Sequence, residues 1–361
     1  LARLQCMNSE TGEHLWKFEY PSDFEDMYGY DNGPRSQPVV DGDRVYTFGP
    51  EGVLHCLRVD TGEVVWKVDT AKEFGVIQNF FGVGSTPVID GELLIANIGG
   101  SPPEDQNVPP GQLDRVSGNG SGVVAFDKHT GKVVYRFSND LASYASPTLA
   151  TIDGRAWCFV FGRAGLTGFD PTSGKQDFYF PWRAGILESV NASTPVVAGD
   201  RVFISETYGP GSALLKVHPG GYDVVWKDEP RTREKAMQLH WNTPIYHEGH
   251  LYGSSGRHPN AAELRCVELA TGKVKWSEPG LMRSSLLYVD GHLICLGEQG
   301  ELYLLRATPE KFDKISHVTL SQNGTRLLKA PCWAAPILAH GLLYVRGKDR
   351  LVCLDLIPDA K

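Results

Sequence analysis

Short runs of apolar and β-branched residues, separated by turn residues, extend along almost the whole chain. One such run is Val53 to Val59, and others are Arg44 to Phe48 and Leu251 to Gly253. Runs of this length bounded by Gly, Asp or Thr are typical of strands joined by tight turns. The pattern therefore predicts an all-β protein built from many short strands.

One turn signature recurs along the chain, and its clearest copy contains Asp60, Thr61, Gly62 and Trp66. Gly supplies the positive φ that the turn requires, and the preceding Thr or Asp can hydrogen-bond the turn backbone. We expect the aromatic residue four positions after Gly to pack between neighbouring sheets. Copies of the signature occupy residues 9–16, 60–66, 128–135, 172–178, 220–226 and 270–276.

A second signature opens each repeated unit with a small polar residue, Pro, two or three β-branched residues and a Gly-containing turn. It is clearest in Gln37 to Asp43 and in Thr194 to Asp200. Together the two signatures predict four short antiparallel strands every roughly 45 to 50 residues, which is the repeat length of β-propeller blades. The openings of the units lie at Pro38, Pro87, Pro147, Pro195, Pro244, Ser285 and Pro336.

These repeats predict an all-β, single-domain β-propeller over residues 1–361, with four-stranded antiparallel blades. A lone four-stranded sheet cannot bury both faces, so repeated sheets pack side by side. The seven openings predict seven full or near-full blades. Because residues 4–8 duplicate a third-strand pattern, we also expect an N-terminal fragment of an eighth blade, with further sequence upstream. An open β-sandwich would not explain six copies of one turn.

Charge and cysteine content narrow the picture further. A net charge of −8 and a sequence pI near 5.8 argue against nucleic-acid binding, which normally requires a basic surface. We find no apolar run long enough to span a bilayer. The seven cysteines cannot all pair with one another, and we expect those at one repeat position to be buried small apolar residues rather than disulfides. These cysteines are Cys6, Cys56, Cys266 and Cys353.

The repeated Thr-Gly-x-x-x-Trp motif resembles the repeat of the pyrroloquinoline quinone (PQQ)-like propeller superfamily. That superfamily includes quinoprotein dehydrogenases and BamB-like assembly proteins, and the chain most resembles planctomycete-type proteins with PQQ-binding-like repeats. The resemblance covers nearly the whole chain and implies a periplasmic or otherwise exported protein. It is specific for the fold and not for the chemistry, because one fold hosts many functions.

Candidate site residues lie in the irregular connections, since loops on a rigid scaffold commonly carry function. Before the first strands of units, and between second and third strands, Arg and aromatic residues occur with a few carboxylates. Such residues suit a sugar, a carboxylate or a phosphate. The candidate ligand-binding residues are Arg35, Tyr144, Asn191, Glu206, His240, Trp241, Arg257, His258, Arg283 and Trp333. The same connections contain Glu51, Phe81, Arg163, Tyr208, Glu298 and Lys348.

One connection is much longer than the others. Residues 97–122 are rich in Pro and Gly, from which we expect neither helix nor strand. Long loops of this kind are lids, binding loops or mobile decorations, and the sequence leaves these alternatives open.

By resemblance, a quinoprotein dehydrogenase would hold PQQ on the propeller axis between a Trp and a disulfide of adjacent cysteines, next to calcium. Trp241 or Trp333 could stack on such a cofactor, and Asn191 or Glu206 could touch the metal. However, no two cysteines are adjacent here, and the pair His240 and His258 has no third metal ligand at a recognisable spacing. We therefore expect no cofactor and no metal site, with PQQ and calcium as the alternative.

The sequence thus favours a non-catalytic binding or scaffold propeller. Its partner would be a protein or a small molecule such as a glycan, bound at the loop face or axial channel. The alternative is a PQQ- and calcium-dependent dehydrogenase of alcohols or sugars. No nucleic-acid partner and no membrane-spanning segment are expected.

Overall fold

A computed structural model describes residues 1–357, in which the chain divides into two compact units. Unit 1 comprises residues 1–200 and 217–222, and unit 2 comprises residues 201–216 and those from 223 onward. The assignment of residues 1–361 to one domain stays a prediction, and its last four residues lie outside the described part.

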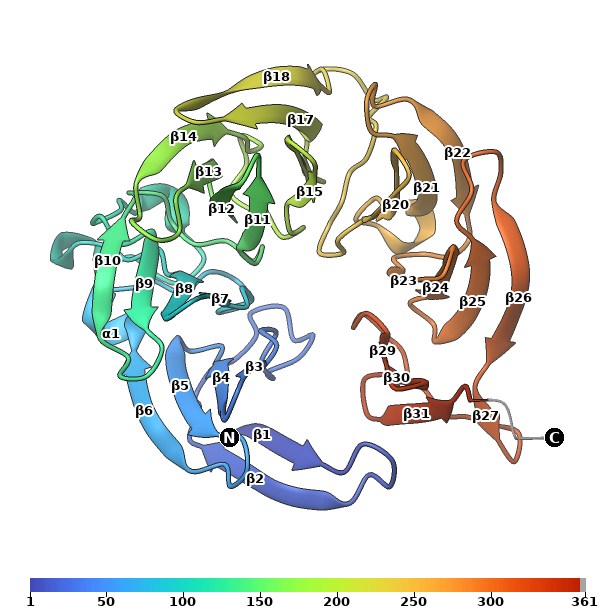
Figure 1. Ribbon diagram of the computed structural model, residues 1–361, viewed down its shortest axis with the longest axis horizontal. Coiled ribbons are helices and arrows are strands. Elements are labelled where there is room, and N and C mark those ends of the chain that lie inside the picture. Colours follow the sequence, from blue (N-terminus) through green and yellow to red (C-terminus); the bar gives the residue numbers. More distant parts are fainter. Residues whose placement is uncertain (358–361) are drawn as a thin grey trace. The chain divides into compact units, whose positions relative to one another are not determined.

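Unit 1 contains three antiparallel sheets whose four strands follow one another in sequence order (Figure 1). Their strands are β3 (Val39–Asp41), β4 (Arg44–Phe48), β5 (Val53–Arg58) and β6 (Val64–Asp69); β7 (Val88–Asp90), β8 (Leu93–Asn97), β9 (Val123–Asp127) and β10 (Val133–Phe137); and β11 (Thr148–Ile152), β12 (Arg155–Phe161), β13 (Gly165–Phe169) and β14 (Gln176–Pro181). An antiparallel pair, β1 (Ala2–Met7) and β2 (His14–Tyr20), precedes them.

Unit 2 repeats this arrangement in two four-stranded sheets and one three-stranded sheet. Their strands are β19 (Ile245–His247), β20 (His250–Ser255), β21 (Glu263–Glu268) and β22 (Val274–Pro279); β23 (Ser285–Val289), β24 (His292–Leu296), β25 (Glu301–Arg306) and β26 (Asp313–Thr319); and β29 (Ile337–Ala339), β30 (Leu342–Arg346) and β31 (Leu351–Asp355). A small hairpin, β27 (Ser321–Gln322) and β28 (Thr325–Arg326), follows β26.

A further four-stranded sheet has the order β15-β16-β17-β18. Its strands are β15 (Val196–Ala198), β16 (Arg201–Glu206), β17 (Gly211–His218) and β18 (Gly221–Lys227).

These sheets confirm the predicted all-β propeller of four-stranded antiparallel blades. Seven blade sheets are present within residues 1–357, and each begins at one of the seven predicted openings. Assignment of β1 and β2 to an eighth blade stays a prediction, because the pair is bonded only as a two-stranded sheet among the described residues.

The core lies between neighbouring sheets and is built mainly from the second and third strands. In unit 1, Tyr46 of β4 and Leu54 of β5 pack with Leu94 of β8 and Phe126 of β9. In unit 2, Tyr252 and Leu264 pack with Leu293 and Leu305 in the same manner. The fourth strand β22 alternates half-buried and exposed residues, because successive side chains of a strand point to opposite faces of the sheet.

The repeated turn explains why Gly and Trp recur together. Trp16 donates from Nε1 to the Val59 carbonyl (2.9 Å), in the turn of the next repeat. A Cβ on Gly62 would lie 2.5 Å from the Trp16 ring, so only Gly fits beneath it. Trp66 covers Gly131 in the same way. The predicted packing of the repeat aromatic between neighbouring sheets is thus confirmed.

The expectation that the four repeat cysteines are all buried is wrong in part. All seven cysteines are free, and Cys56 and Cys266 are buried, whereas Cys6 is half-buried and Cys353 is exposed. Cys353 lies on β31, the edge strand of a three-stranded sheet, where Leu351, Cys353 and Asp355 are exposed in alternation.

Helical segments are few and short. They are α1 (Thr70–Phe74), η1 (Pro103–Asp105), η2 (Leu113–Arg115) and η3 (Pro259–Ala261). No helix in residues 1–357 is long and apolar enough to cross a membrane.

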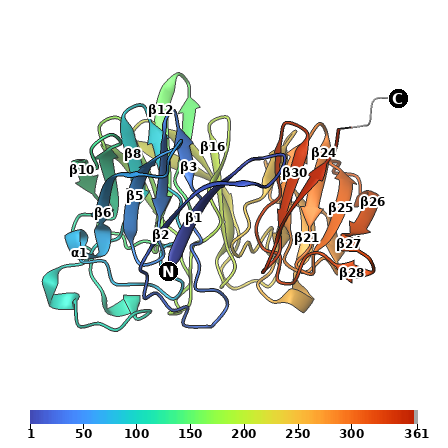
Figure 2. The same ribbon diagram turned by 90° about the horizontal axis from the view of Figure 1, so that it is seen from below.

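The long insertion contains η1 and η2, so the expectation of no helix in it is wrong. In Figure 2 the insertion extends past the ends of the strands, on the same side as α1. Its backbone is tied to the 74–78 segment, because Asn119 Nδ2 donates to the Phe74 carbonyl (2.8 Å) and Gly111 N–H donates to that of Gln78 (2.8 Å). These bonds favour a fixed loop over a mobile decoration.

Candidate functional site

The predicted site residues fall into both units, and unit 2 brings most of its members together. We call Tyr208, His240, Trp241, Arg257, Arg283, Glu298 and Trp333 the Arg–Trp cluster. Tyr208, Arg257 and Glu298 follow the second strands of their sheets, and the other members precede first strands. Six connections of the repeat thus contribute to one group of side chains.

Arg283 organises this cluster. Its guanidinium carbon lies 4.7 Å from the Trp241 ring centre and 5.3 Å from that of Trp333. The ring centres of Trp241 and Trp333 are 4.9 Å apart. Stacking of a guanidinium on indole rings contributes about 0.5–2 kcal/mol per pair. Arg283 therefore stabilises the positions of both Trp rings.

Glu298 neutralises Arg283 and orients Trp333. Its carboxylate accepts from Arg283 Nε (2.9 Å) and from a second guanidinium nitrogen, and also from Trp333 Nε1 (3.0 Å). Burial alone would raise the pKa of Glu298, but these hydrogen bonds outweigh it and lower the pKa. Arg283 also donates to the Arg257 carbonyl (3.2 Å). Its guanidinium group therefore makes contacts within the cluster that stabilise the site.

His240 is a neutral member of the cluster. Its Nε2 lies 3.3 Å from the Tyr208 hydroxyl, and its ring centre is 4.6 Å from that of Trp241. Burial lowers the pKa of His240 to about 3, and the neighbouring Arg283, Arg257 and His258 lower it further. Among the described residues, the buried Nδ1 of His240 has no hydrogen-bond partner. At neutral pH the His240 ring is therefore uncharged, and its Nδ1 is the ring nitrogen without a partner among the described residues.

Arg257 is the exposed cation of the cluster. Its guanidinium lies 4.8 Å from the Tyr208 ring centre, and its Nε donates to His258 Nε2 (3.1 Å). This bond places His258 beside Arg257 rather than in a metal site with His240. Glu206 is fully buried at the end of β16 and therefore does not present a carboxylate at the surface.

In unit 1, Arg35 and Tyr144 meet on the Phe81 segment. Arg35 pairs with Asp26 (2.5 Å), donates to the Phe81 carbonyl (3.1 Å) and lies over the Phe81 ring (5.2 Å). The Tyr144 hydroxyl accepts from the Phe81 backbone N–H (3.0 Å). Both predicted residues thus shape one loop of unit 1.

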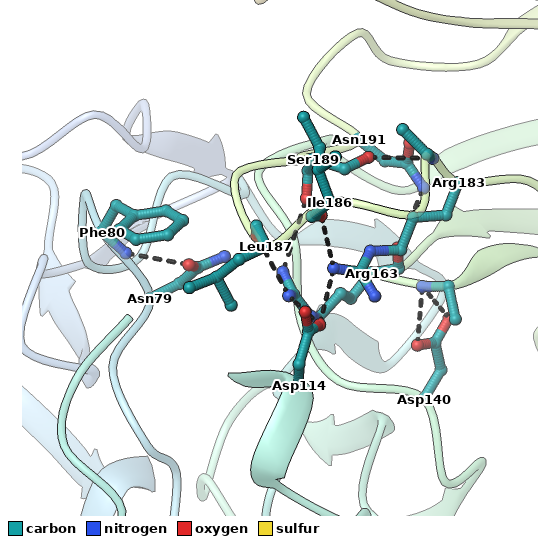
Figure 3. Close-up of polar contacts among 12 residues, drawn as sticks. Asn79, Phe80, Asp114, Asp140, Arg163, Arg183, Ile186, Leu187, Ser189 and Asn191 are labelled. Atoms are coloured by element: carbon teal, nitrogen blue, oxygen red, sulfur yellow. Dashed lines mark hydrogen bonds and ion pairs between the residues drawn. The ribbon is translucent and has the colours of Figure 1, made fainter. Parts of the chain in front are cut away.

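Asn191 is fully buried, and its side chain hydrogen-bonds backbone carbonyls of unit 1 (Figure 3). Its Nδ2 donates to the carbonyls of Gly162 and Trp182 (both 2.9 Å) and to that of Arg163 (3.3 Å). Its Nδ2 thus joins the β14–β15 connection to the β12–β13 connection, and the predicted role of Asn191 in touching a ligand or a metal stays a prediction.

The insertion joins this network through Asp114 of η2 (Figure 3). Its carboxylate accepts from Arg163 and from Arg183, both at 2.7 Å. Burial alone would raise the pKa of Asp114, and the two guanidinium groups outweigh it and lower the pKa. The nearby Asp140 has no such cation bonded to it within residues 1–357, and burial raises its pKa to about 6, although backbone N–H groups including that of Ala164 oppose the shift.

Sequence reasoning missed Asn79, Asn97, Asp114 and Asp140. Asn79 and Asn97 line a small cavity in unit 1, and each has a buried Nδ2 without a hydrogen-bond partner within residues 1–357. An isolated Asn beside Phe80 and Phe81, or at the end of a strand, carries no motif that marks it as functional. The one available signal was the unusual length of the 97–122 connection, which contains Asn97 and Asp114.

The residues present do not fit the cofactor site that the resemblance implied. Within residues 1–357 no three His, Cys, Asp or Glu side chains gather in a group that could hold a metal ion. The seven cysteines are all free, and none is adjacent to another in sequence.

Comparison with solved structures shows the same fold in proteins of different activity. BamB from Moraxella catarrhalis matches with a TM-score of 0.61 and 14% identity, covering 98% of this chain and 88% of its own. The quinohemoprotein alcohol dehydrogenase from Comamonas testosteroni matches with a TM-score of 0.59 and 12% identity. The match covers 95% of this chain and 67% of the dehydrogenase. At these identities the likeness concerns the fold alone.

Comparison of sequences shows the family. No curated protein sequence matches the chain. The family model described as outer membrane protein assembly factor BamB matches residues 2–278. The repeated turns, the four-stranded blades and this match together show that the chain belongs to the BamB-like family of PQQ-type β-propellers.

Proposed function

We propose that this protein is a non-catalytic binding propeller whose Arg–Trp cluster recognises a partner protein. The observation that carries the proposal is the pair of half-buried indoles, Trp241 and Trp333, held by Arg283 beside the exposed Arg257. Trp, Tyr and Arg dominate the residues that supply binding energy at protein interfaces. Membership of the BamB-like family supports this function and an exported, periplasmic location.

The chemistry of the cluster supports recognition rather than a reaction. Arg283 and Glu298 are bonded to each other, and the lowered pKa of His240 keeps its ring neutral at pH 7. Arg257 is the member whose charge faces solvent and can meet a carboxylate, while Tyr208 and Trp241 offer aromatic faces. An acidic segment carrying an apolar side chain would match this arrangement.

The proposal can be tested by placing a photo-crosslinking amino acid at Arg257 in the native cell. Position 273 is the matched control, because Lys273 is exposed and lies at the other end of β21 from Arg257. We expect a discrete crosslinked partner from position 257 only. With that partner purified, Trp241→Ala should weaken binding at least about tenfold, as for interface hot spots, and Lys273→Ala should not.

Two results would contradict the proposal. Equal crosslinking from both positions would show that the Arg–Trp cluster is not the interface. Tight, calcium-dependent binding of PQQ in a calorimetric titration, together with dye reduction in the presence of an alcohol or aldose, would show a dehydrogenase instead.

A further inference from the structure

Unit 1 carries an exposed aromatic surface that does not involve the Arg–Trp cluster. Met27, Tyr28 and Tyr30 lie in the connection from β2 to β3 and are 56%, 53% and 47% exposed. The ring centres of the two tyrosines are 6.3 Å apart, and their planes differ by 26°. We call these three residues the tyrosine loop. Large apolar and aromatic side chains that are exposed together are typical of interaction sites.

The backbone of the tyrosine loop is fixed by a buried carboxylate. The side chain of Asp26 is fully buried, and it accepts from the backbone N–H groups of Tyr28 (2.8 Å) and Asp31 (3.2 Å). Arg35 neutralises this carboxylate (2.5 Å). The Asn32 side chain in turn accepts from the Asp26 N–H (2.9 Å). Because the loop is already ordered, binding a partner costs little further conformational entropy.

The two tyrosine rings pack on a pair of phenylalanines. The Tyr28 ring centre lies 5.8 Å from that of Phe80 and 5.6 Å from that of Phe81. The Tyr30 ring centre lies 6.2 Å from that of Phe81. Arg35 stacks on the same group, since its guanidinium carbon is 5.2 Å from the Phe81 ring centre. These aromatic rings thus already hold one guanidinium group, and the exposed parts of the tyrosine rings offer the same chemistry to solvent.

The sequence around the tyrosine loop is acidic. Residues 18–34 contain five Asp or Glu residues and no Lys, Arg or His. The two flanking cations each pair with a carboxylate of this segment. Asp23, Glu25 and Asp31 are exposed, and none of them forms an ion pair in the described part of the chain. A surface of this charge attracts a cationic partner and repels an anionic one.

The spacing of the two rings indicates the form of that partner. In an extended chain, residues two positions apart point to the same side and lie about 6.6 Å apart. This distance matches the 6.3 Å between the ring centres of Tyr28 and Tyr30. Among cationic side chains, Arg is the best suited to stack on an aromatic face, because its guanidinium group is planar and weakly hydrated.

We propose that the tyrosine loop binds an extended Arg-x-Arg segment of a partner protein. One guanidinium group stacks on Tyr28 and the other on Tyr30, and the exposed carboxylates of Asp23, Glu25 and Asp31 attract the charge of the segment. This surface goes beyond the function proposed for the Arg–Trp cluster, which lies in unit 2 and favours an acidic segment.

Calorimetric titration of the full chain with two matched peptides tests the surface. The first is a capped peptide of four Arg-Gly repeats, and the second has citrulline in place of each Arg, which keeps the shape of the side chain but removes its charge. At about 0.15 M salt, where long-range attraction is largely screened, we expect the Arg peptide to bind at least about fivefold more tightly, because stacking on each ring depends on the cation. Equal binding of both peptides, or no binding of the Arg peptide, would overturn the proposal.

Variants locate the binding within the chain. The double variant Tyr28→Ala, Tyr30→Ala should weaken binding of the Arg peptide at least about fivefold. Tyr246→Ala is the matched control and should leave it unchanged, since Tyr246 is 41% exposed on β19 of unit 2. Glu25→Gln removes one exposed charge and should weaken binding about twofold even if the double variant does not fold. Unchanged affinity in a folded double variant would show attraction to the net charge of −8 alone and refute the proposed surface.

Discussion

Asp140 shows how the surroundings of a single carboxyl group decide its charge. Its carboxylate accepts from the Ala164 N–H (2.9 Å), and burial raises its pKa to about 6. Asp114, in the same region of unit 1, has a lowered pKa because Arg163 and Arg183 bond to it. The two aspartates therefore differ because Asp114 is exposed and bonded to two guanidinium groups, whereas Asp140 is more deeply buried and accepts from backbone N–H groups.

This difference predicts opposite effects of two matched substitutions. Between the ordinary pKa near 3.8 and about 6, folded Asp140 holds more protons than the unfolded chain, so its contribution to stability falls as pH rises through that window. Asp140→Asn should therefore raise the thermal midpoint at pH 7.5, with little gain at pH 4. Asp114→Asn should lower the midpoint at pH 7.5. Equal effects of Asp140→Asn at both pH values would contradict the assignment.

At the scale of the element, the aromatic residue of one repeat packs on the turn Gly of the next repeat. Four repeat aromatics lie over the Gly of the following turn, and the polar atom of each bonds a carbonyl of that turn, as Trp226 Nε1 does with Leu269 (2.8 Å). They are Trp16, Trp66, Tyr135 and Trp226. The turn thus requires Gly for two reasons, which are the positive φ at this position and the aromatic ring that lies over it.

A pair of substitutions separates these two requirements. Gly62 and Gly12 have nearly the same φ, +73° and +72°, but only Gly62 has a ring within 4 Å of the position of a Cβ among the described residues. Gly12→Ala should cost about 1 kcal/mol from backbone strain. Gly62→Ala should cost a further ~1–3 kcal/mol from overpacking against Trp16. Urea denaturation measures the free energy of unfolding of both variants. Equal losses would mean that the Trp16 ring moves aside without a cost in free energy.

At the scale of the whole molecule, each unit carries one histidine that folding keeps neutral. His55 in unit 1 is 3% exposed and packs against Phe18 and Tyr20, and burial lowers its pKa to about 4. His240 in unit 2 has its pKa lowered to about 3 for the same reason, with help from neighbouring cations. Both histidines titrate near 6.5 once the chain unfolds.

We therefore expect stability to be lost as pH falls below about 6.5. Below that value the unfolded chain binds more protons than the folded one at both histidines, so these two sites favour unfolding in acid, with an uptake approaching about two protons. Asp140 opposes them by up to about one proton below pH 6. Unfolding free energies measured from pH 7.5 to 5 should fall less steeply in the double variant His55→Gln, His240→Gln than in the parent. An unchanged slope would show that these rings are already charged in the folded protein.

The local parts of the fold were predictable because they depend on neighbours in sequence. Pro38 and Pro336 open first strands, and Gly62 makes a tight turn, for reasons contained in a few residues each. The repeat of these signals predicted the all-β class, the four-stranded blades and the role of Trp16 and Trp66. The exposure of Cys353 was not predictable, since it depends on what covers an edge strand.

The sequence by itself thus determined the blades, the connections in which functional residues lie, and the family resemblance. Only the tertiary structure decided which of those residues meet: it joins His240, Trp241, Arg283 and Trp333 into one cluster and buries Asn191 among backbone carbonyls. It also brings Asn79 and Asn97 to one cavity. The physical reason is that a turn is stabilised by contacts within a few residues, whereas the position of a loop side chain depends on packing against residues distant in the chain.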